Sequence, residues 1–170
     1  FGVGFFMRPV GGILLGMYSD RKWRKAAMQM IIRLMTVSIA LIAFAPNYAA
    51  IGMGAPLLIV VARMLQGFAT GGEYASATAF LVESAPAHRK GLYGSWQLVG
   101  QCLAVFAGAG MVALFTHLLT PEALDSWGWR IPFMIGLLIG PVGLWIRKHM
   151  EEPEEFLEAR KQAKGESPGL

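Results

Sequence analysis

The chain has 170 residues, of which 55% are hydrophobic and 15% are charged, against about 25% charged residues in an ordinary soluble domain. Its 15 basic and 11 acidic side chains are too few to cover a water-soluble core, so a soluble enzyme is disfavoured. The formal net charge of +4 does not point to nucleic acid, because the basic residues cluster in short breaks between long apolar runs.

Long apolar segments dominate the chain. A membrane-spanning helix needs about 20 mostly apolar residues, and five segments meet this requirement: residues 1–18, 26–45, 56–82, 92–116 and 130–149. Polar, charged or Pro/Gly-containing turns separate them. The sequence therefore predicts an all-α integral membrane fold of five transmembrane helices. Because the chain opens in an apolar run without an initiator Met, we expect a fragment that begins inside a helix.

Basic residues indicate the orientation of these helices, since basic loops stay on the cytoplasmic side of a membrane. Eleven Lys and Arg residues lie in the first and third connections between the apolar segments and at the end of the chain. The second and fourth connections together contain one basic residue, Arg130. This predicts a cell (inner) membrane protein with its start outside and its tail cytoplasmic. Trp127 and Trp129 are expected to anchor a helix end at the interface. Residues 150–170 are polar and predict a solvated linker.

Polar side chains follow one face of the third apolar segment. A helix turns about 100° per residue, which places on that face Arg63, Gln66, Thr70, Glu73 and Tyr74. Lipid satisfies neither charges nor hydrogen-bonding groups. We therefore expect this stripe to face a water-filled cavity or the bundle interior.

A weaker stripe on the fourth segment contains Tyr93, Gln97 and Gln101, and these two helices are candidates to line one cavity. The alternative for the two glutamines is plain interhelical hydrogen bonding. Two further arginines receive a structural interpretation: Arg33 is expected to be held by a neighbouring helix, and Arg8, which precedes Pro9, to support a kink or a packing contact.

Small residues recur at four-residue spacing, which favours close packing of membrane helices. The pairs and triplets are Gly12/Gly16, Gly67/Gly71, Gly100/Ala104/Gly108 and Gly136/Gly140. The single cysteine, Cys102, and histidines without metal-ligand spacing favour neither a disulfide framework nor a metal site.

Three separated motifs resemble known transporters. Residues 8–25 resemble the loop signature of major facilitator transporters, to which five positions correspond: Gly16, Asp20, Arg21, Arg24 and Lys25. Residues 63–74 resemble the fourth-helix signature of the metabolite:proton symporter branch, whose members carry citrate, 2-oxoglutarate, shikimate, or proline and betaine. Residues 127–133 and the Glu-rich exit after the last helix are similar to that branch as well.

This resemblance implies that residues 1–149 are a partial N-terminal half, helices two to six of a twelve-helix fold. Residues 150–170 would begin the cytoplasmic linker between the halves. The first helix and the C-terminal half would be the missing partners. Because such transporters bind substrate between two pseudo-symmetric halves, the chain supplies half a site.

The resemblance also implies a gate, which the family's loop Asp and Arg hold closed. Here these residues are Asp20 and Arg24, and Glu83 is the natural acidic partner of Arg24; plain positive-inside charge is the alternative. Trp23 stands where the family's loop usually has glycine. A tryptophan is strained in a turn with positive φ, so either the turn differs here or the loop is impaired.

The resemblance implies proton-coupled symport of a small metabolite by alternating access. The cation Arg63 favours an organic acid, such as citrate or another di- or tricarboxylate, as the substrate. Arg63 would pair with a substrate carboxylate or an acidic group of the coupling pathway, and Gln66, Tyr74, Gln97 and Gln101 would orient substrate. Glu73 is a candidate proton carrier, because a low dielectric favours the neutral form of a carboxylate. The proton is then the coupling ion and no cofactor is expected.

Other interpretations stay open at this point. A shikimate-type or proline/betaine-type symporter fits the same motifs, and so does a nonfunctional truncated fragment or a membrane scaffold in which the stripe only packs. A membrane-embedded enzyme would need a nucleophile with a base, or a metal cluster, at membrane depth, and the sequence shows no such set. The sequence does not identify the substrate.

Overall fold

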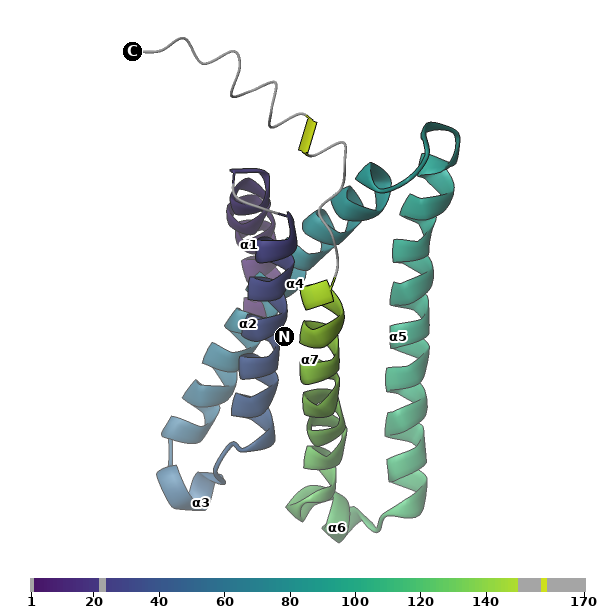
Figure 1. Cartoon of the computed structure of the whole chain (residues 1–170). Coiled ribbons are helices and arrows are strands. Elements are labelled where there is room, and N and C mark those ends of the chain that lie inside the picture. The colour runs from purple at the N-terminus through teal and green to yellow at the C-terminus, as the bar shows by residue number, and fades with distance from the viewer. Residues whose placement is uncertain (1, 22–23, 150–156, 159–170) are drawn as a thin grey trace, which may run out of the picture.

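The computed structural model describes residues 2–21, 24–149 and 157–158, and these residues form helices and turns without a strand (Figure 1). The long helices are α1 (Gly2–Arg21), α2 (Arg24–Ala43), α4 (Gly54–Glu83), α5 (Lys90–Leu118) and α7 (Ile131–His149). Short helical turns connect them: α3 (Tyr48–Ile51), η1 (Ala87–Arg89), α6 (Pro121–Ser126) and η2 (Gly128–Arg130).

The expected helical membrane fold is confirmed. In the part of the chain that the structure describes, four segments are long and apolar enough to cross a membrane: residues 24–43, 54–83, 87–118 and 128–149. The expected first span, residues 1–18, corresponds to α1, which has the length of a span but is not among these four. Five glycines, together with Arg8 and Pro9, lower its mean hydropathy.

Helix α4 is the centre of the bundle. It packs against α1, α2 and α5, and α2 also packs against α7. Leu15, Ile31 and Ala69, one from each of α1, α2 and α4, form a buried apolar cluster. By contrast, α5 has no buried residue and stands apart from α1 and α2 in Figure 1. The outer surface of α5 is therefore apolar and exposed.

The backbones of α1 and α4 approach each other at glycines. A Cβ atom added to Gly67 would lie 1.9 Å from the carbonyl oxygen of Gly4, and one added to Gly71 would lie 2.0 Å from that of Arg8. Real Cβ atoms do not come this close to a backbone oxygen, so only glycine fits. The close packing predicted for Gly67/Gly71 is confirmed.

The other small-residue sets behave differently. A Cβ on Gly140 would meet Thr36 at 2.6 Å, whereas Gly12 and Gly136 have ordinary van der Waals surroundings. Within the described residues, a Cβ on Gly16, Gly100 or Gly108 would meet nothing within 4 Å. The described residues thus do not form the close packing expected at these three glycines. For Gly100 and Gly108 the reason is that α4 is the main long helix that α5 contacts.

The two ends of the bundle are chemically distinct. The end of α1, the end of α4 and the end of α7 lie on one side, and α3 and α6 lie on the other (Figure 1). On that second side, the Arg130 guanidinium donates to the carbonyl of Ala45 at 3.0 Å and to Asn47 Oδ1 at 2.8 Å. It also stacks 4.5 Å above the ring of Trp129. Arg130 therefore ties the α2–α3 connection to the start of α7.

We expect Gly67→Ala to lower the free energy of unfolding by about 1–3 kcal/mol through overpacking. Gly108→Ala is the matched control, because its Cβ would meet nothing within 4 Å. Unfolding is followed by denaturant titration in mixed micelles. Equal stability of the two variants would contradict the glycine-dependent contact of α1 with α4.

Candidate functional site

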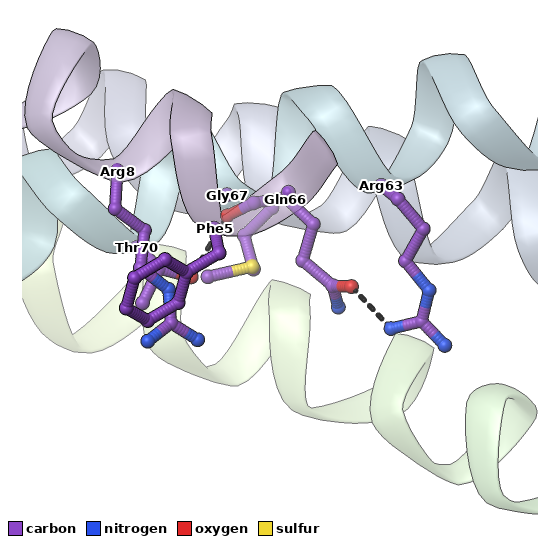
Figure 2. Close-up of a pocket in the computed structure, with 8 residues that line it drawn as sticks. Phe5, Arg8, Arg63, Gln66, Gly67 and Thr70 are labelled. Atoms are coloured by element: carbon purple, nitrogen blue, oxygen red, sulfur yellow. Dashed lines mark hydrogen bonds between the residues drawn. The ribbon is translucent and has the colours of Figure 1, made fainter. Parts of the chain in front are cut away.

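The polar face of α4 borders a cavity of about 340 Å³ between α1 and α4. Figure 2 shows the side chains that line it, among them Phe5 and Arg8 of α1 and Arg63, Gln66 and Thr70 of α4. No carboxylate is among the described residues that line this cavity. Two guanidinium groups thus share one cavity.

Local contacts hold these groups in place. Arg63 Nη1 donates to Gln66 Oε1 at 2.8 Å, and the Thr70 hydroxyl donates to the backbone carbonyl of Gln66 at 2.8 Å. The Arg8 guanidinium lies 5.3 Å from the centroid of the Phe5 ring, which is a cation–π distance (Figure 2). Arg63 and Gln66 are therefore oriented as a pair, and the predicted face of α4 does border a cavity.

Arg8 has two roles in the structure. Its backbone carbonyl lies at the close approach to Gly71, which agrees with the expected packing contact, and its side chain also lines the cavity with Arg63. The two arginines lie 55 positions apart on separate helices. No local pattern predicts that they share a cavity, because this depends on how closely α1 approaches α4.

A second cavity, of about 330 Å³, lies between α4 and α5. The predicted stripes of both helices meet in it, through Glu73 and Tyr74 of α4 and Gln97 and Gln101 of α5. Thr70 lines both cavities. The structure also adds Trp96 to this lining, a residue that sequence analysis did not select, whereas Tyr93 is not among the lining residues.

Glu73 has a partner that the sequence did not indicate. Arg147 Nη2 lies 2.9 Å from Glu73 Oε1, and Arg147 Nη1 donates to the backbone carbonyl of Met28 at 2.6 Å. The Arg147 side chain is 15% exposed and that of Glu73 is 37% exposed. This partly buried contact links α7, α4 and α2, whereas sequence analysis counted Arg147 only among the basic residues at the end of the chain.

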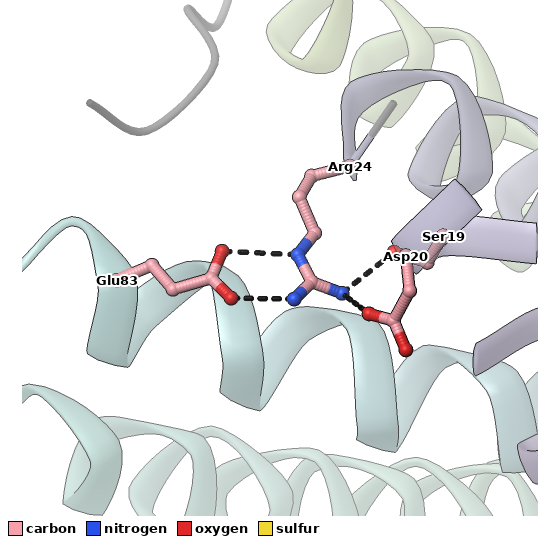
Figure 3. A network of polar contacts seen from close by, with 4 residues as sticks. All are labelled: Ser19, Asp20, Arg24 and Glu83. Atoms are coloured by element: carbon pink, nitrogen blue, oxygen red, sulfur yellow. Dashed lines mark hydrogen bonds and ion pairs between the residues drawn. The ribbon is translucent and has the colours of Figure 1, made fainter. Parts of the chain in front are cut away.

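A second polar network joins the ends of three helices (Figure 3). Arg24, at the start of α2, makes a bidentate contact with Glu83 at the end of α4, with Nε 2.9 Å from Oε2 and Nη2 bonded to Oε1. Its Nη1 also pairs with Asp20 and donates to the buried hydroxyl of Ser19 at 3.2 Å. Arg24 and Glu83 therefore meet as sequence analysis expected, and Ser19 is an additional acceptor.

The remaining motif residues occupy different surroundings. Arg21 is exposed at the end of α1, and Lys25 lines a third cavity described below. Trp23, where we expected a departure of the turn, lies outside the described residues. Within the described part of the chain, no group of three or more His, Cys, Asp or Glu residues is arranged to hold a metal ion.

Comparison with known proteins shows which family this chain belongs to. A family model described as "Sugar (and other) transporter" matches residues 1–167. The chain is 42% identical over 156 residues to the shikimate transporter of Escherichia coli (strain K12), with 92% of this chain and 36% of that protein covered. It is 41% identical over 160 residues to the citrate-proton symporter of Klebsiella pneumoniae, with 94% and 36% covered.

A third relative has a different substrate in its name. The chain is 39% identical over 171 residues to the proline/betaine transporter of Salmonella typhimurium, with 100% of this chain and 34% of that protein covered. The chain thus spans about a third of the length of the curated relatives it matches. These relatives are membrane transporters and not enzymes.

Solved structures show the same fold. The inward-open xylose transporter XylE from E. coli matches with a TM-score of 0.77 and 21% identity, covering 96% of this chain and 39% of that chain. The major facilitator proton:xylose symporter XylE bound to 6-bromo-6-deoxy-D-glucose matches with a TM-score of 0.78 and 20% identity, covering 96% and 37%. The expected partial major facilitator fold is confirmed.

The network around Arg24 predicts unequal effects of its two carboxylates. In the full-length transporter, Glu83→Gln should lower the free energy of unfolding by about 1.5–3 kcal/mol, because it removes a charged hydrogen bond from a mostly buried partner. Asp20→Asn should cost less than about 1 kcal/mol, as for other exposed ion pairs, because the Asp20 side chain is 65% exposed. Denaturant titration in mixed micelles measures both, and equal losses would contradict this ranking.

Proposed function

From the premise that this chain belongs to the sugar (and other) transporter family of the major facilitator superfamily, we propose that the whole protein is a proton-coupled symporter of a small organic acid. The chain is part of a multi-pass membrane protein. It spans about a third of its curated relatives, so it supplies one wall of a substrate pathway. The first helix and the second half of the fold supply the rest.

The observation that carries this proposal is the cavity between α1 and α4. Arg8 and Arg63 both line it, with Gln66 and Thr70 as hydrogen-bonding neighbours. Guanidinium groups bind carboxylates with charge-assisted hydrogen bonds, often in pairs. An anion of low molecular weight with at least one carboxylate is the ligand class that suits this cavity.

The relatives support the same ligand class. The names of two of them specify shikimate and citrate, which are organic acids, and the name of the citrate transporter also specifies proton symport. Proline and betaine, named in a third relative, each carry one carboxylate as well. We propose a di- or tricarboxylate such as citrate, because two arginines suit more than one carboxylate. Shikimate-type and proline/betaine-type substrates are the alternatives.

Glu73 is the proposed proton carrier. It lines the cavity between α4 and α5, and it also contacts Arg147 of α7. A proton on Glu73 removes the charge that Arg147 contacts, so protonation and this ion pair compete. Proton binding would thereby loosen α7 from α4, which is the kind of coupling that a symport cycle needs. The proton serves as the coupling ion, and the proposal involves no cofactor.

The Arg24 network is the proposed gate. It joins the end of α1 and the start of α2 to the end of α4 through Asp20, Arg24 and Glu83. Basic residues concentrate at this end of the bundle, so we assign it to the cytoplasmic side of the cell (inner) membrane, with the tail cytoplasmic. Rocking of the two halves around the cavities would then open and close this end.

Removal of either cavity arginine should weaken carboxylate uptake. In a transport-deficient host that expresses the full-length protein, Arg8→Gln and Arg63→Gln should each raise the KM for labelled citrate by about 10- to 150-fold, the loss of one charge-assisted hydrogen bond. Arg89→Gln, an exposed substitution in η1, is the charge-matched control. An unchanged KM in both cavity variants, at equal surface expression, would contradict the binding role.

Proton coupling is tested separately. Uptake of labelled carboxylates should collapse when a protonophore is added, and Glu73→Gln should abolish accumulation against a gradient while leaving downhill exchange. Glu122→Gln, an exposed substitution in α6, should behave as wild type. If neither the protonophore nor Glu73→Gln changes uptake, the protein is a facilitator that does not use a proton gradient. That result would contradict the role of Glu73 as proton carrier.

A further inference from the structure

A third cavity lies between α2 and α7 and is not part of the pathway described above. It measures about 540 Å³ and is lined by Lys25, Gln29, Arg33, Leu144, Trp145 and Lys148. Three of these six residues are cationic, and Leu144 and Trp145 are apolar. The cavity therefore brings cationic side chains next to apolar surface.

The α2 wall of the cavity is a polar stripe. Lys25, Gln29 and Arg33 follow one another at four-residue spacing, which aligns them on one face of a helix. Arg33 lies about 12 Å along α2 from Lys25, well inside the apolar span. Side chains on a helix tilt toward its N-terminus, so Arg33 extends toward Lys25 and the membrane surface. An isolated cation at this depth is costly in lipid.

The α7 wall combines charge with an indole ring. Trp145 is 65% exposed, and two residues along a helix turn by about 200°, so Trp145 faces away from Arg147, which contacts Glu73. Lys148 lies near the end of α7 and tilts back along the helix toward the level of Arg33. Helix α7 thus presents Arg147 to the interior and Trp145 with Lys148 to a second surface.

We propose that this cavity binds the phosphate headgroup of an anionic membrane lipid. Basic pockets between transmembrane helices bind acidic headgroups, and indole rings favour the membrane interface. Lys25, Arg33 and Lys148 contact the phosphate, and Leu144 with Trp145 packs against the glycerol and the upper acyl chains. The depth of Arg33 favours a lipid over a free aqueous anion, because a lipid brings its phosphate and its apolar part to the same place.

The test uses the full-length transporter in detergent micelles, and it measures lipid binding by native mass spectrometry. The probes are dioleoyl-phosphatidylglycerol, which is anionic, and dioleoyl-phosphatidylcholine, which is zwitterionic; the two lipids have the same acyl chains. Phosphatidylglycerol should bind more tightly than phosphatidylcholine, and Arg33→Gln/Lys148→Gln should weaken its binding by roughly thirtyfold, the effect of two lost cation contacts. The charge-matched control, Arg89→Gln/Lys90→Gln, should retain most of the affinity, because these residues lie outside the cavity.

Three results would overturn the proposal: equal binding of both lipids, equal losses in the two double variants, or displacement of phosphatidylglycerol by inorganic phosphate at the same concentration. The last result would assign the cavity to a free anion.

A second measurement does not depend on the folding of the double variant. Phosphatidylglycerol brominated on its acyl chains should quench the tryptophan emission of the wild type more than brominated phosphatidylcholine does. Trp145→Phe should abolish that difference, and a difference that persists would place the lipid elsewhere. None of these measurements involves uptake, so they test the lipid site independently of the proposed transport function.

Discussion

The contact between the backbones of α1 and α4 is the constraint on which the rest of the structure depends. Gly67 and Gly71 of α4 face backbone oxygens of α1 at distances that no Cβ atom tolerates. This contact fixes how each helix is rotated about its own axis, because only one face of each has the required glycines. With that rotation fixed, Arg8 and Arg63 both reach the cavity between the two helices. The cationic cavity is therefore a consequence of backbone packing.

Charged side chains then connect the helices that the glycines bring together. Arg24 links the end of α1 and the start of α2 to α4 through Asp20 and Glu83, and Arg147 links α7 to α4 through Glu73. Both links end on α4, the helix with neighbours on several sides. Removing Glu83 or Glu73 would leave a mostly buried charge in a poor solvent, so these two contacts are more consequential than an exposed ion pair such as that of Asp20. They also join the cavity linings to the ends of the helices.

Neighbouring residues on α7 illustrate how one helix serves two surfaces. Arg147 contacts Glu73 inside the bundle, whereas Lys148 lines the cavity beside α2. The two interior cavities meet at Thr70, and the third cavity is separated from them by α2 and α7. The division of polar groups between the interior and an outer surface follows from helix periodicity, because adjacent residues point about 100° apart.

The sequence by itself determined the helical membrane fold and the polar face of α4, because a single helix carries the apolar length and the periodicity that indicate them. The family and the pairing of Glu83 with Arg24 came from motifs that resemble known transporters, and not from local periodicity. Only the tertiary structure decided that Arg8 joins Arg63, that Glu73 contacts Arg147, and that Gly100 and Gly108 do not form a close interface within the described residues. These pairings depend on the rotation and separation of helices far apart in the chain. Packing sets both quantities, and spacing along the sequence does not encode them.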